Sequence, residues 1–175
     1  HLSLRRQRQM CIRDRCLGDP VVVIGAGGVG LAAIMGAKLS GAYPLIAVDV
    51  DEDKLALARR LGATHTVLAG EGDPVDDVLA IAPGGVAWAI EAVGRPQTLA
   101  TAVRMLRPLG TAVAVGLGAV GQTFEVPINE LVQRQKKIVG SLYGSSVPAL
   151  DLPAIFELYR AGLLPLDAVS YTHLR

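Results

Sequence analysis

Three glycines in the first part of the chain have the spacing of a loop that binds phosphate groups. They are Gly25, Gly27 and Gly30, in the pattern G-x-G-x-x-G, and they directly follow the apolar run at residues 21–24. In such a loop the first glycine permits a tight turn, the second lets the backbone approach a pyrophosphate, and the third lets a helix pack closely on a strand. A glycine-rich turn that binds no ligand can have the same composition. The surrounding sequence must therefore distinguish a phosphate-binding loop from a simple turn.

An acid closes the next apolar run. Residues 45–48 are Leu-Ile-Ala-Val, and Asp49 follows them. A strand before the glycines, a helix after them and an acid at the end of the second strand together indicate a dinucleotide site. The carboxylate of Asp49 would accept hydrogen bonds from the adenosine ribose and repel a 2′-phosphate, which favours NAD over NADP. The alternative for Asp49 is a plain turn or cap acid.

The helix after the glycine loop is expected over residues 28–40, which places Gly28 and Val29 in its first turn. Backbone N–H groups there would face the phosphates, because a helix N-terminus attracts negative charge. Lys54, on the next expected helix, either reaches over the adenosine ribose or pairs within its own helical turns. Gly36 costs helix propensity, and we attribute it to close packing against the sheet.

The two ends of the chain look foreign to the rest of it. Residues 9–14, Gln-Met-Cys-Ile-Arg-Asp, and residues 169–174, Val-Ser-Tyr-Thr-His-Leu, can be encoded by DNA strands that are reverse complements, codon for codon. This DNA resembles the transposon-end adapter of sequencing libraries. We therefore expect residues 1–16 to be a non-native arm and residues 169–175 a non-native tail, against the alternative of a natural basic arm and tail.

Excluding the ends changes the charge of the protein. The whole chain has 17 Lys and Arg against 16 Asp and Glu, but the ends hold six arginines and one acid, so residues 16–168 keep 11 bases and 15 acids, a net charge of −4. The basic arm disappears, and with it any reason to expect a nucleic-acid partner. Only Cys16 and His65 remain as Cys and His in this range, too few for a metal site or a disulfide.

Composition and hydropathy point to one domain outside membranes. The chain is 51% hydrophobic, rich in Ala, Val and Leu. It contains no apolar run long enough and free enough of polar and charged residues to span a bilayer, so no membrane association is expected. We expect a cytoplasmic setting from the cysteine usage and from the lack of a signal peptide.

Short apolar runs alternate with helical segments along the chain. Strands are expected at residues 21–24, 45–48, 65–68, 86–90, 111–115 and 137–142. Helices are expected at residues 28–40, 52–61, 74–81, 97–106, 129–135 and 152–161. Buried strands joined by right-handed helical crossovers predict a Rossmann-type α/β domain over residues 17–168, with a doubly wound six-stranded parallel sheet of order 3-2-1-4-5-6.

The ligand crevice of such a sheet lies outside the carboxyl ends of the first and fourth strands, where the strand order reverses. Val93 and Gly94 follow the expected fourth strand, and Gly116 and Leu117 follow the fifth. We expect these four residues to join the glycine loop there, with Val93 and Leu117 as apolar walls for adenine or nicotinamide. Glu91, on the same rim, is interpreted as a structural acid, and no residue of the chain is assigned a catalytic role.

Three other polar residues have plain structural interpretations. His65 opens the expected third strand and is interpreted as a strand-entry residue rather than a base. Lys136 and Lys137 stand at the start of the last strand, and we expect either a solvated pair or a pair that protects a sheet edge from further pairing.

The order of motifs resembles the nucleotide-binding domain of zinc-dependent alcohol dehydrogenases, in the medium-chain dehydrogenase/reductase superfamily. The motifs are VVIGAGGVGL (22–31), AVDVDEDKL (47–55), LGATH (61–65), EAVG (91–94), LRPLGT (106–111) and IVGS (138–141). The resemblance extends over residues 17–168. It implies NAD as the cofactor, with Gly27, Gly28 and Val29 on the pyrophosphate, Asp49 and Lys54 on the adenosine ribose, and Val93, Gly116 and Leu117 toward the nicotinamide.

The sequence also departs from this family. Members hold a catalytic zinc with ligands from a preceding domain and from the segment just before the first strand, where this chain has the foreign arm. The cysteine cluster of the structural zinc is absent, and so is the segment that follows residues 165–167 in the family. We therefore expect the cofactor-binding fragment of a zinc-type alcohol dehydrogenase, with zinc in the full-length parent and no ligands for it in this chain.

The parent enzyme is expected to transfer hydride between an alcohol and NAD, with the alcohol or aldehyde bound through the missing domain. The fragment alone is expected to be inactive. The resemblance further implies a homodimer through the strand edge from Ile138 to Leu142. Two alternatives remain open: a fragment of a zinc-free quinone or enoyl reductase, whose usual NADPH preference fits Asp49 poorly, and a non-catalytic NAD-sensing module.

Overall fold

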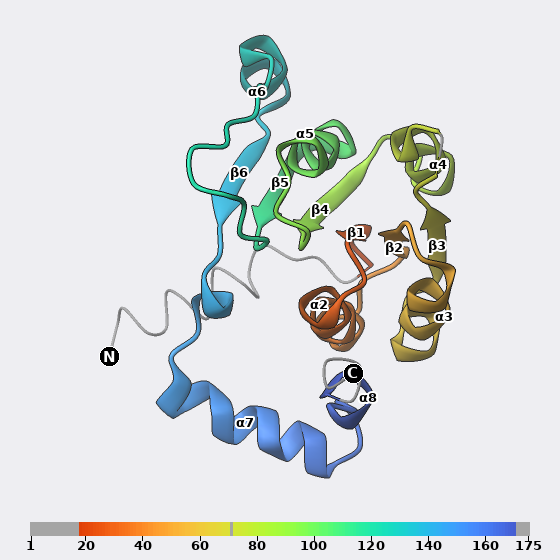
Figure 1. The fold of residues 1–175 in the computed structure, drawn as a ribbon, viewed down its shortest axis with the longest axis vertical. Helices are drawn as coiled ribbons and strands as arrows, with labels where there is room; N and C mark the ends of the chain where they lie inside the picture. The colour runs from red at the N-terminus through yellow and green to blue at the C-terminus, as the bar shows by residue number, and fades with distance from the viewer. Residues whose placement is uncertain (1–17, 71, 171–175) are drawn as a thin grey trace.

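The computed structural model of the chain describes residues 18–70 and 72–170. The expected arm and residues 171–175 of the expected tail lie outside this range. Six parallel strands form one sheet in the order β3-β2-β1-β4-β5-β6 (Figure 1), which confirms the predicted doubly wound Rossmann fold. The strands are β1 (Val21–Ile24), β2 (Leu45–Asp49), β3 (His65–Leu68), β4 (Val86–Glu91), β5 (Leu106–Ala114) and β6 (Lys137–Gly140).

Helices cover both faces of this sheet. They are α2 (Gly28–Leu39), α3 (Glu52–Leu61), α4 (Pro74–Ile81), α5 (Pro96–Arg104), α6 (Ile128–Arg134), α7 (Pro148–Arg160) and α8 (Asp167–Ser170), with a 3-10 turn η1 (Tyr143–Ser145). In Figure 1, α2 and α3 lie on one side of the strands, and α4 and α5 on the other. Among the described residues, no helix has the length and apolar character needed to cross a lipid bilayer.

The side chains of β1 alternate between two separate hydrophobic cores. Val22 and Ile24 pack in the core under α4 and α5, whereas Val21 and Val23 pack in the core under α2 and α3. All four residues are buried, at 5% exposure or less. Burial of a Val or Ile side chain stabilises the fold by about 1.5–3 kcal/mol. The uninterrupted apolar run therefore reflects a strand covered on both faces.

The strand register brings four loops to one edge of the sheet. Ile24 of β1 pairs with Val48 of β2 and with Glu91 of β4, and Glu91 pairs with Ala114 of β5. Because these pairs lie at the carboxyl ends of parallel strands, the segments after β1, β2, β4 and β5 leave the sheet at the same rim. This is the edge at which the crevice is predicted.

Some element boundaries differ from the predicted ones. β5 begins at Leu106, and its register against β4 shifts between the pairs Val86 with Leu106 and Trp88 with Thr111. The predicted turn before this strand is therefore an irregularity within it, with Leu109 at a φ of 66°. β6 ends at Gly140, α7 begins earlier than predicted, and α8 was not expected.

Two predictions about individual residues are wrong. A Cβ at Gly36 would meet no atom within 4 Å, so close packing does not explain this glycine. Lys136 is buried at 7% exposure, while Lys137 is exposed. The Lys136 Nζ donates to the Val103 carbonyl oxygen at 2.8 Å and pairs with Glu130, so this ammonium joins α5, α6 and β6.

Candidate functional site

Two glycines of the loop after β1 are fixed by contacts within the protein. Gly25 has a φ of 92°, a left-handed conformation that glycine adopts without strain, and its Cβ would lie 2.7 Å from Val93 Cγ2. A Cβ at Gly30 would overlap the carbonyl oxygen of Gly25. Gly27 differs, because a Cβ there would meet nothing within 4 Å. The space beside Gly27 is therefore open to a ligand.

The first turn of α2 faces this open space without a side-chain cap. The helix begins at Gly28, the N-cap Gly27 supplies no side-chain hydrogen bond, and the first turn contains no acid. The initial N–H groups of a helix have no carbonyl partner inside it, and its dipole favours an anion. Val29 in this turn is 57% exposed. The arrangement can take a phosphate group at Gly28 and Val29.

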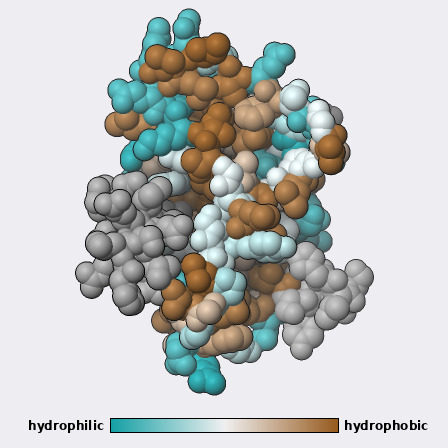
Figure 2. All heavy atoms as spheres, turned by 90° about the vertical axis from the view of Figure 1, so that its left-hand side faces the viewer, coloured by the Kyte–Doolittle hydropathy of each residue, from teal (hydrophilic) through white to brown (hydrophobic). Residues whose placement is uncertain are grey.

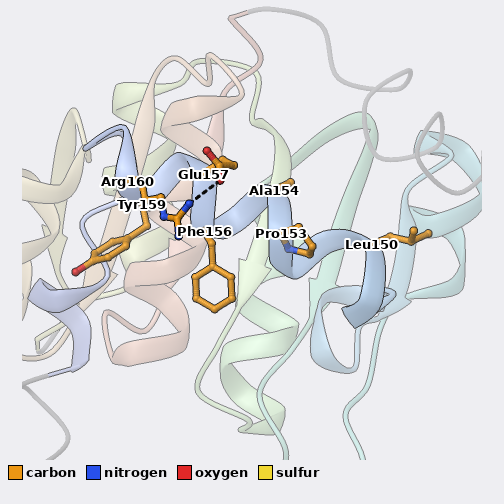
Figure 3. Close-up of a pocket in the computed structure, with 7 residues that line it drawn as sticks. All are labelled: Leu150, Pro153, Ala154, Phe156, Glu157, Tyr159 and Arg160. Atoms are coloured by element: carbon orange, nitrogen blue, oxygen red, sulfur yellow. Dashed lines mark hydrogen bonds and ion pairs between the residues drawn. The ribbon is translucent and has the colours of Figure 1, made fainter.

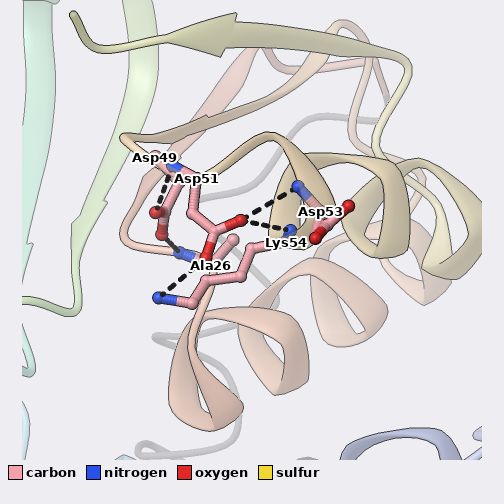
Figure 4. Close-up of polar contacts among 5 residues, drawn as sticks. All are labelled: Ala26, Asp49, Asp51, Asp53 and Lys54. Carbon is pink, nitrogen blue, oxygen red and sulfur yellow. Dashed lines mark hydrogen bonds and ion pairs between the residues drawn. The ribbon is translucent and has the colours of Figure 1, made fainter.

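Asp49 connects the end of β2 to the glycine loop (Figure 4). Its Oδ2 accepts a hydrogen bond from the Ala26 N–H at 2.6 Å, and its Oδ1 accepts one from the Asp51 N–H at 3.1 Å. The cap of α3 is Asp51, whose Oδ1 accepts from the Asp53 and Lys54 N–H groups. Asp49 therefore links the loop after β1 to the loop after β2, while Asp51 caps α3.

Lys54 adopts the predicted alternative arrangement within its own helix. Its Nζ lies 3.8 Å from Asp51 Oδ2, and the side chain is half exposed. Such an exposed ion pair contributes at most about 1 kcal/mol.

The loops after β4 and β5 interlock backbone against backbone. Gly94 has a φ of 83°, and its Cβ would lie 2.5 Å from the Leu117 carbonyl oxygen. A Cβ at Gly116 would overlap the Gly94 nitrogen. Val93 and Leu117 present their side chains outward, at 41% and 84% exposure. The structure thus brings these four predicted residues together, and the contact of Val93 with Gly25 joins them to the glycine loop.

Three groups in the rim were not singled out as site residues from the sequence. The Ala26 N–H anchors Asp49, and Thr98 donates its hydroxyl to Glu91 Oε1 at 2.7 Å. Glu91 itself is buried, and the structure confirms its structural interpretation. Nothing in the sequence near Thr98 marks it, because its partner is defined only by the turn from β4 into α5. Ala26 acts through its backbone, which side-chain patterns do not reveal.

Within residues 18–70 and 72–170, no group of three or more His, Cys, Asp or Glu residues is placed to hold a metal ion. His65 begins β3, as predicted, and its Nδ1 lies 2.9 Å from Thr64 Oγ1. Cys16 lies outside the described residues. The donor set in this part of the chain therefore does not fit a zinc site of ordinary ligand number.

A hollow of about 710 Å³ lies elsewhere, along α7 (Figure 3). Phe156 and Tyr159 line it together with other residues of the same helix. None of the predicted cofactor residues borders it. The hollow is therefore not part of the crevice at the carboxyl edge.

Comparisons with known proteins agree with this architecture. Residues 28–159 match the sequence profile described as zinc-binding dehydrogenase. Alcohol dehydrogenase 1 of Pisum sativum is 38% identical over 154 residues, which are 86% of this chain and 40% of that protein. The crystal structure of benzyl alcohol dehydrogenase from Acinetobacter calcoaceticus superposes with a TM-score of 0.83 at 39% identity, covering 86% of this chain and 41% of that one.

A third similar protein carries a cofactor in its crystal structure. It is a zinc-binding dehydrogenase, described as putative, from Sinorhizobium meliloti, bound to NADP, with a TM-score of 0.75 and 29% identity. The match covers 84% of this chain and 43% of that protein. The chain thus spans about two fifths of the length of the relatives it matches.

Proposed function

The chain belongs to the zinc-binding dehydrogenase family, and on this basis we propose that it is the NAD-binding portion of an alcohol dehydrogenase. In this proposal the parent protein transfers hydride between an alcohol and NAD. The alcohol or aldehyde and the zinc ion bind through a portion of the parent that this chain does not contain. Residues 17–168 are the cofactor domain, the flanking segments are non-native, and the parent is cytoplasmic.

The observation that carries the choice of cofactor is the anchored carboxylate of Asp49. Its hydrogen bonds to the Ala26 and Asp51 N–H groups hold the carboxylate at the edge of the glycine loop. A ribose whose pyrophosphate lies on this loop would place its hydroxyl groups near Asp49. A 2′-phosphate in the same place would bring like charges together, which supports NAD over NADP.

The open space at Gly27 and the uncapped start of α2 fit the pyrophosphate of the same ligand. Val93, Gly94, Gly116 and Leu117 fit the nicotinamide half as an apolar wall. NAD, when bound, supplies the hydride-accepting ring, and the residues of this chain bind it and orient it. The described residues offer no metal site, so no step of the reaction is assigned to zinc here.

The two alternatives from the sequence are not favoured by the comparisons. The similar proteins described above include an alcohol dehydrogenase and a benzyl alcohol dehydrogenase. Neither the quinone or enoyl reductase nor the non-catalytic sensor gains an observation of its own. Because one similar protein is bound to NADP in its crystal structure, the comparison of NAD with NADP is the decisive test of the cofactor.

Calorimetric titration of the purified chain with NAD and with NADP tests this proposal. NAD should bind at least about tenfold more tightly than NADP. Repulsion between Asp49 and the 2′-phosphate of NADP needs to cost only about 1.4 kcal/mol to produce that ratio. Asp49→Asn should remove most of the preference. Asp51→Asn is the matched control, because Asn caps a helix as well as Asp does and the substitution removes a neighbouring charge. Equal affinity for both cofactors in the wild-type chain would contradict the choice of NAD.

Activity of the isolated chain provides a second test. We expect no oxidation of ethanol or benzyl alcohol when NAD is added, since the chain supplies only cofactor contacts in this proposal. Formation of NADH by the pure 175-residue chain would show that it holds catalytic residues of its own.

A further inference from the structure

Glu91 combines deep burial with an unusual number of donors. The residue is 1% exposed, and its Oε1 accepts hydrogen bonds from the Val93 N–H at 2.9 Å, the Gly94 N–H at 2.8 Å and the Thr98 hydroxyl at 2.7 Å. A buried carboxylate is unfavourable unless donors compensate for the lost water, and bonds to an ionised acceptor are stronger than neutral ones. Glu91 therefore fixes the loop after β4 to the first turn of α5.

The main chain of the same residue holds the loop after β5. The Glu91 carbonyl oxygen accepts from the Val115 N–H at 2.9 Å and from the Gly116 N–H at 3.0 Å. The next residue, Ala92, donates its N–H to the Ile24 carbonyl oxygen at 2.9 Å. Glu91 and Ala92 thus connect the end of β1 with the segments after β4 and β5.

The adenosine side of the crevice has a separate support. The hydrogen bonds of Asp49 run to Ala26 and Asp51, and none of them involves Glu91. The two halves meet at the contact of Val93 with Gly25, but the hydrogen bonds that hold them are separate. This separation allows a role for Glu91 to be measured without changing the contacts proposed for the ribose.

We propose that Glu91 is a positioning residue for the nicotinamide half of the cofactor. Its carboxylate holds Val93 and Gly94 in the conformation that locks against Leu117, and so sets the wall on which the nicotinamide ring rests. The inference depends on the proposed function, since it assigns the rim to a dinucleotide. Glu91 acts through the backbone of Val93 and Gly94 and needs no contact with the cofactor.

The test compares NAD with ADP, which contains the adenosine and pyrophosphate but lacks the nicotinamide half. In Glu91→Ala, the Val93 and Gly94 N–H groups and the Thr98 hydroxyl lose their common acceptor. We expect the Kd for NAD to rise at least about tenfold and the Kd for ADP to change less than about twofold, because a free-energy loss of 1.4 kcal/mol produces a tenfold change. Both constants are measured by calorimetry on the full chain.

Two conservative variants separate the effect of side-chain length at position 91 from the effect of its charge. They also keep the test valid if the alanine variant does not fold. Glu91→Asp keeps the charge but is one methylene shorter, so it cannot reach Val93, Gly94 and Thr98 together. We expect a weaker NAD affinity and an unchanged ADP affinity. Glu91→Gln keeps the accepting oxygen in place, and we expect its ratio of NAD to ADP affinity to stay near that of the wild type.

Hydrogen exchange adds a readout that requires no ligand. The Val93 and Gly94 amides should exchange slowly in the wild type and in Glu91→Gln, and faster in Glu91→Asp. Glu157→Ala is the control, because it removes an exposed carboxylate whose ion pair with Arg160 lies on α7, away from the rim. It should leave both the amide exchange and the affinity ratio unchanged.

The outcomes distinguish the two proposals. A wild-type chain that binds neither NAD nor ADP contradicts the proposed function. A wild-type chain that binds both, with Glu91→Asp at the wild-type affinity ratio, overturns the role of Glu91 and leaves the proposed function intact. Equal losses for NAD and ADP in Glu91→Asp also overturn it, since they indicate general damage to the fold.

Discussion

Gly27 differs from the other two glycines of its loop in what surrounds it. Gly25 and Gly30 are required by the protein itself, because a side chain at either would collide with Val93 or with the backbone of Gly25. Gly27 has open space around its Cα and a φ of −75°, which any residue adopts. The free protein gives no steric reason for glycine there, which points to the ligand as the reason.

Gly27→Ala should therefore fold and yet bind NAD weakly. Its methyl group would occupy the space into which a pyrophosphate must come, so we expect the Kd to rise about tenfold or more, equivalent to 1.4 kcal/mol. Alanine is a poorer N-cap than glycine, and the melting temperature should fall only slightly. Calorimetry with NAD and thermal unfolding by circular dichroism measure the two effects.

Gly36→Ala is the matched control for that variant. Gly36 also has no atom within 4 Å of its Cβ position, but it lies inside α2 away from the helix start. Alanine there should stabilise the protein by about 0.5–1 kcal/mol through helix propensity and leave NAD affinity unchanged. Wild-type affinity in Gly27→Ala would remove the argument that this glycine serves the cofactor.

At the scale of elements, α4 and α5 are joined by a carboxylate that also caps a helix. Asp73 is the N-cap of α4, its Oδ1 accepts from the Val75 N–H at 3.1 Å, and its Oδ2 lies 2.7 Å from the Arg104 guanidinium at the end of α5. The Val75 N–H is the main cause that holds the pKa of Asp73 below its ordinary value of 3.8. Burial acts in the opposite direction, and the hydrogen bond and charge of Arg104 lower the pKa further.

This lowered pKa predicts a defined pH dependence of stability. Because the folded pKa lies below the unfolded one, the stabilisation is complete above the unfolded value and is lost as the pH falls from about 3.8 through the folded pKa. Asp73→Asn keeps a good cap but removes the charge, whereas Asp73→Ala also loses the cap and should cost about 1 kcal/mol at pH 7.

Urea unfolding of the wild type and Asp73→Asn between pH 7 and pH 3 measures the effect. At pH 7 the wild type should have the higher free energy of unfolding. The two values should converge as the pH falls below the ordinary pKa of 3.8. Arg104→Ala should reduce the difference, because it removes one cause of the shift. A difference that is constant over the whole range would contradict the role of the Asp73 charge.

The Lys136–Glu130 pair predicts unequal effects for its two members. Lys136 is buried and Glu130 only partly so, with side-chain exposures of 1% and 27%. Glu130→Ala leaves a buried ammonium with the Val103 carbonyl as its remaining partner and should cost about 2–3 kcal/mol, below the range for a fully buried pair. Lys136→Met replaces the ammonium by an apolar chain and leaves a carboxylate that can turn to water, so it should cost less. Urea midpoints measure both, and the reverse order would contradict this account.

Sequence patterns predicted the sheet well because its strands carry a signal in their own residues. The run Val21–Ile24 is apolar at every position, as a strand buried on both faces must be, and the glycine spacing and Asp49 place the loops after it. Lys136 and Gly36 were misinterpreted for the opposite reason. The partners of Lys136 lie on α5 and α6, and the open space beside Gly36 arises only in the folded chain, so neither is determined by nearby residues.

At the scale of the whole molecule, the sheet has two edge strands, and both carry exposed apolar side chains. β3 forms one edge and β6 the other. On the side of the molecule where β6 lies, Figure 2 shows hydrophobic residues gathered at the surface. Val139 in β6 and Leu142 just after it are 42% and 64% exposed. An exposed edge strand with apolar side chains can pair with another strand.

We therefore predict that the chain forms a homodimer through residues 138–142. Multi-angle light scattering after size exclusion should give twice the mass of 18.3 kDa for the wild type.

Val139→Lys should give the monomer mass, because a buried unpaired ammonium at a strand edge opposes pairing. Leu68→Lys is the matched control, since Leu68 is 46% exposed on β3 at the opposite edge, and it should remain dimeric. Val139→Lys should keep wild-type affinity for NAD, because none of the proposed cofactor residues lies on β6. A monomeric wild-type chain, or a dimer that survives Val139→Lys, would contradict pairing at this edge.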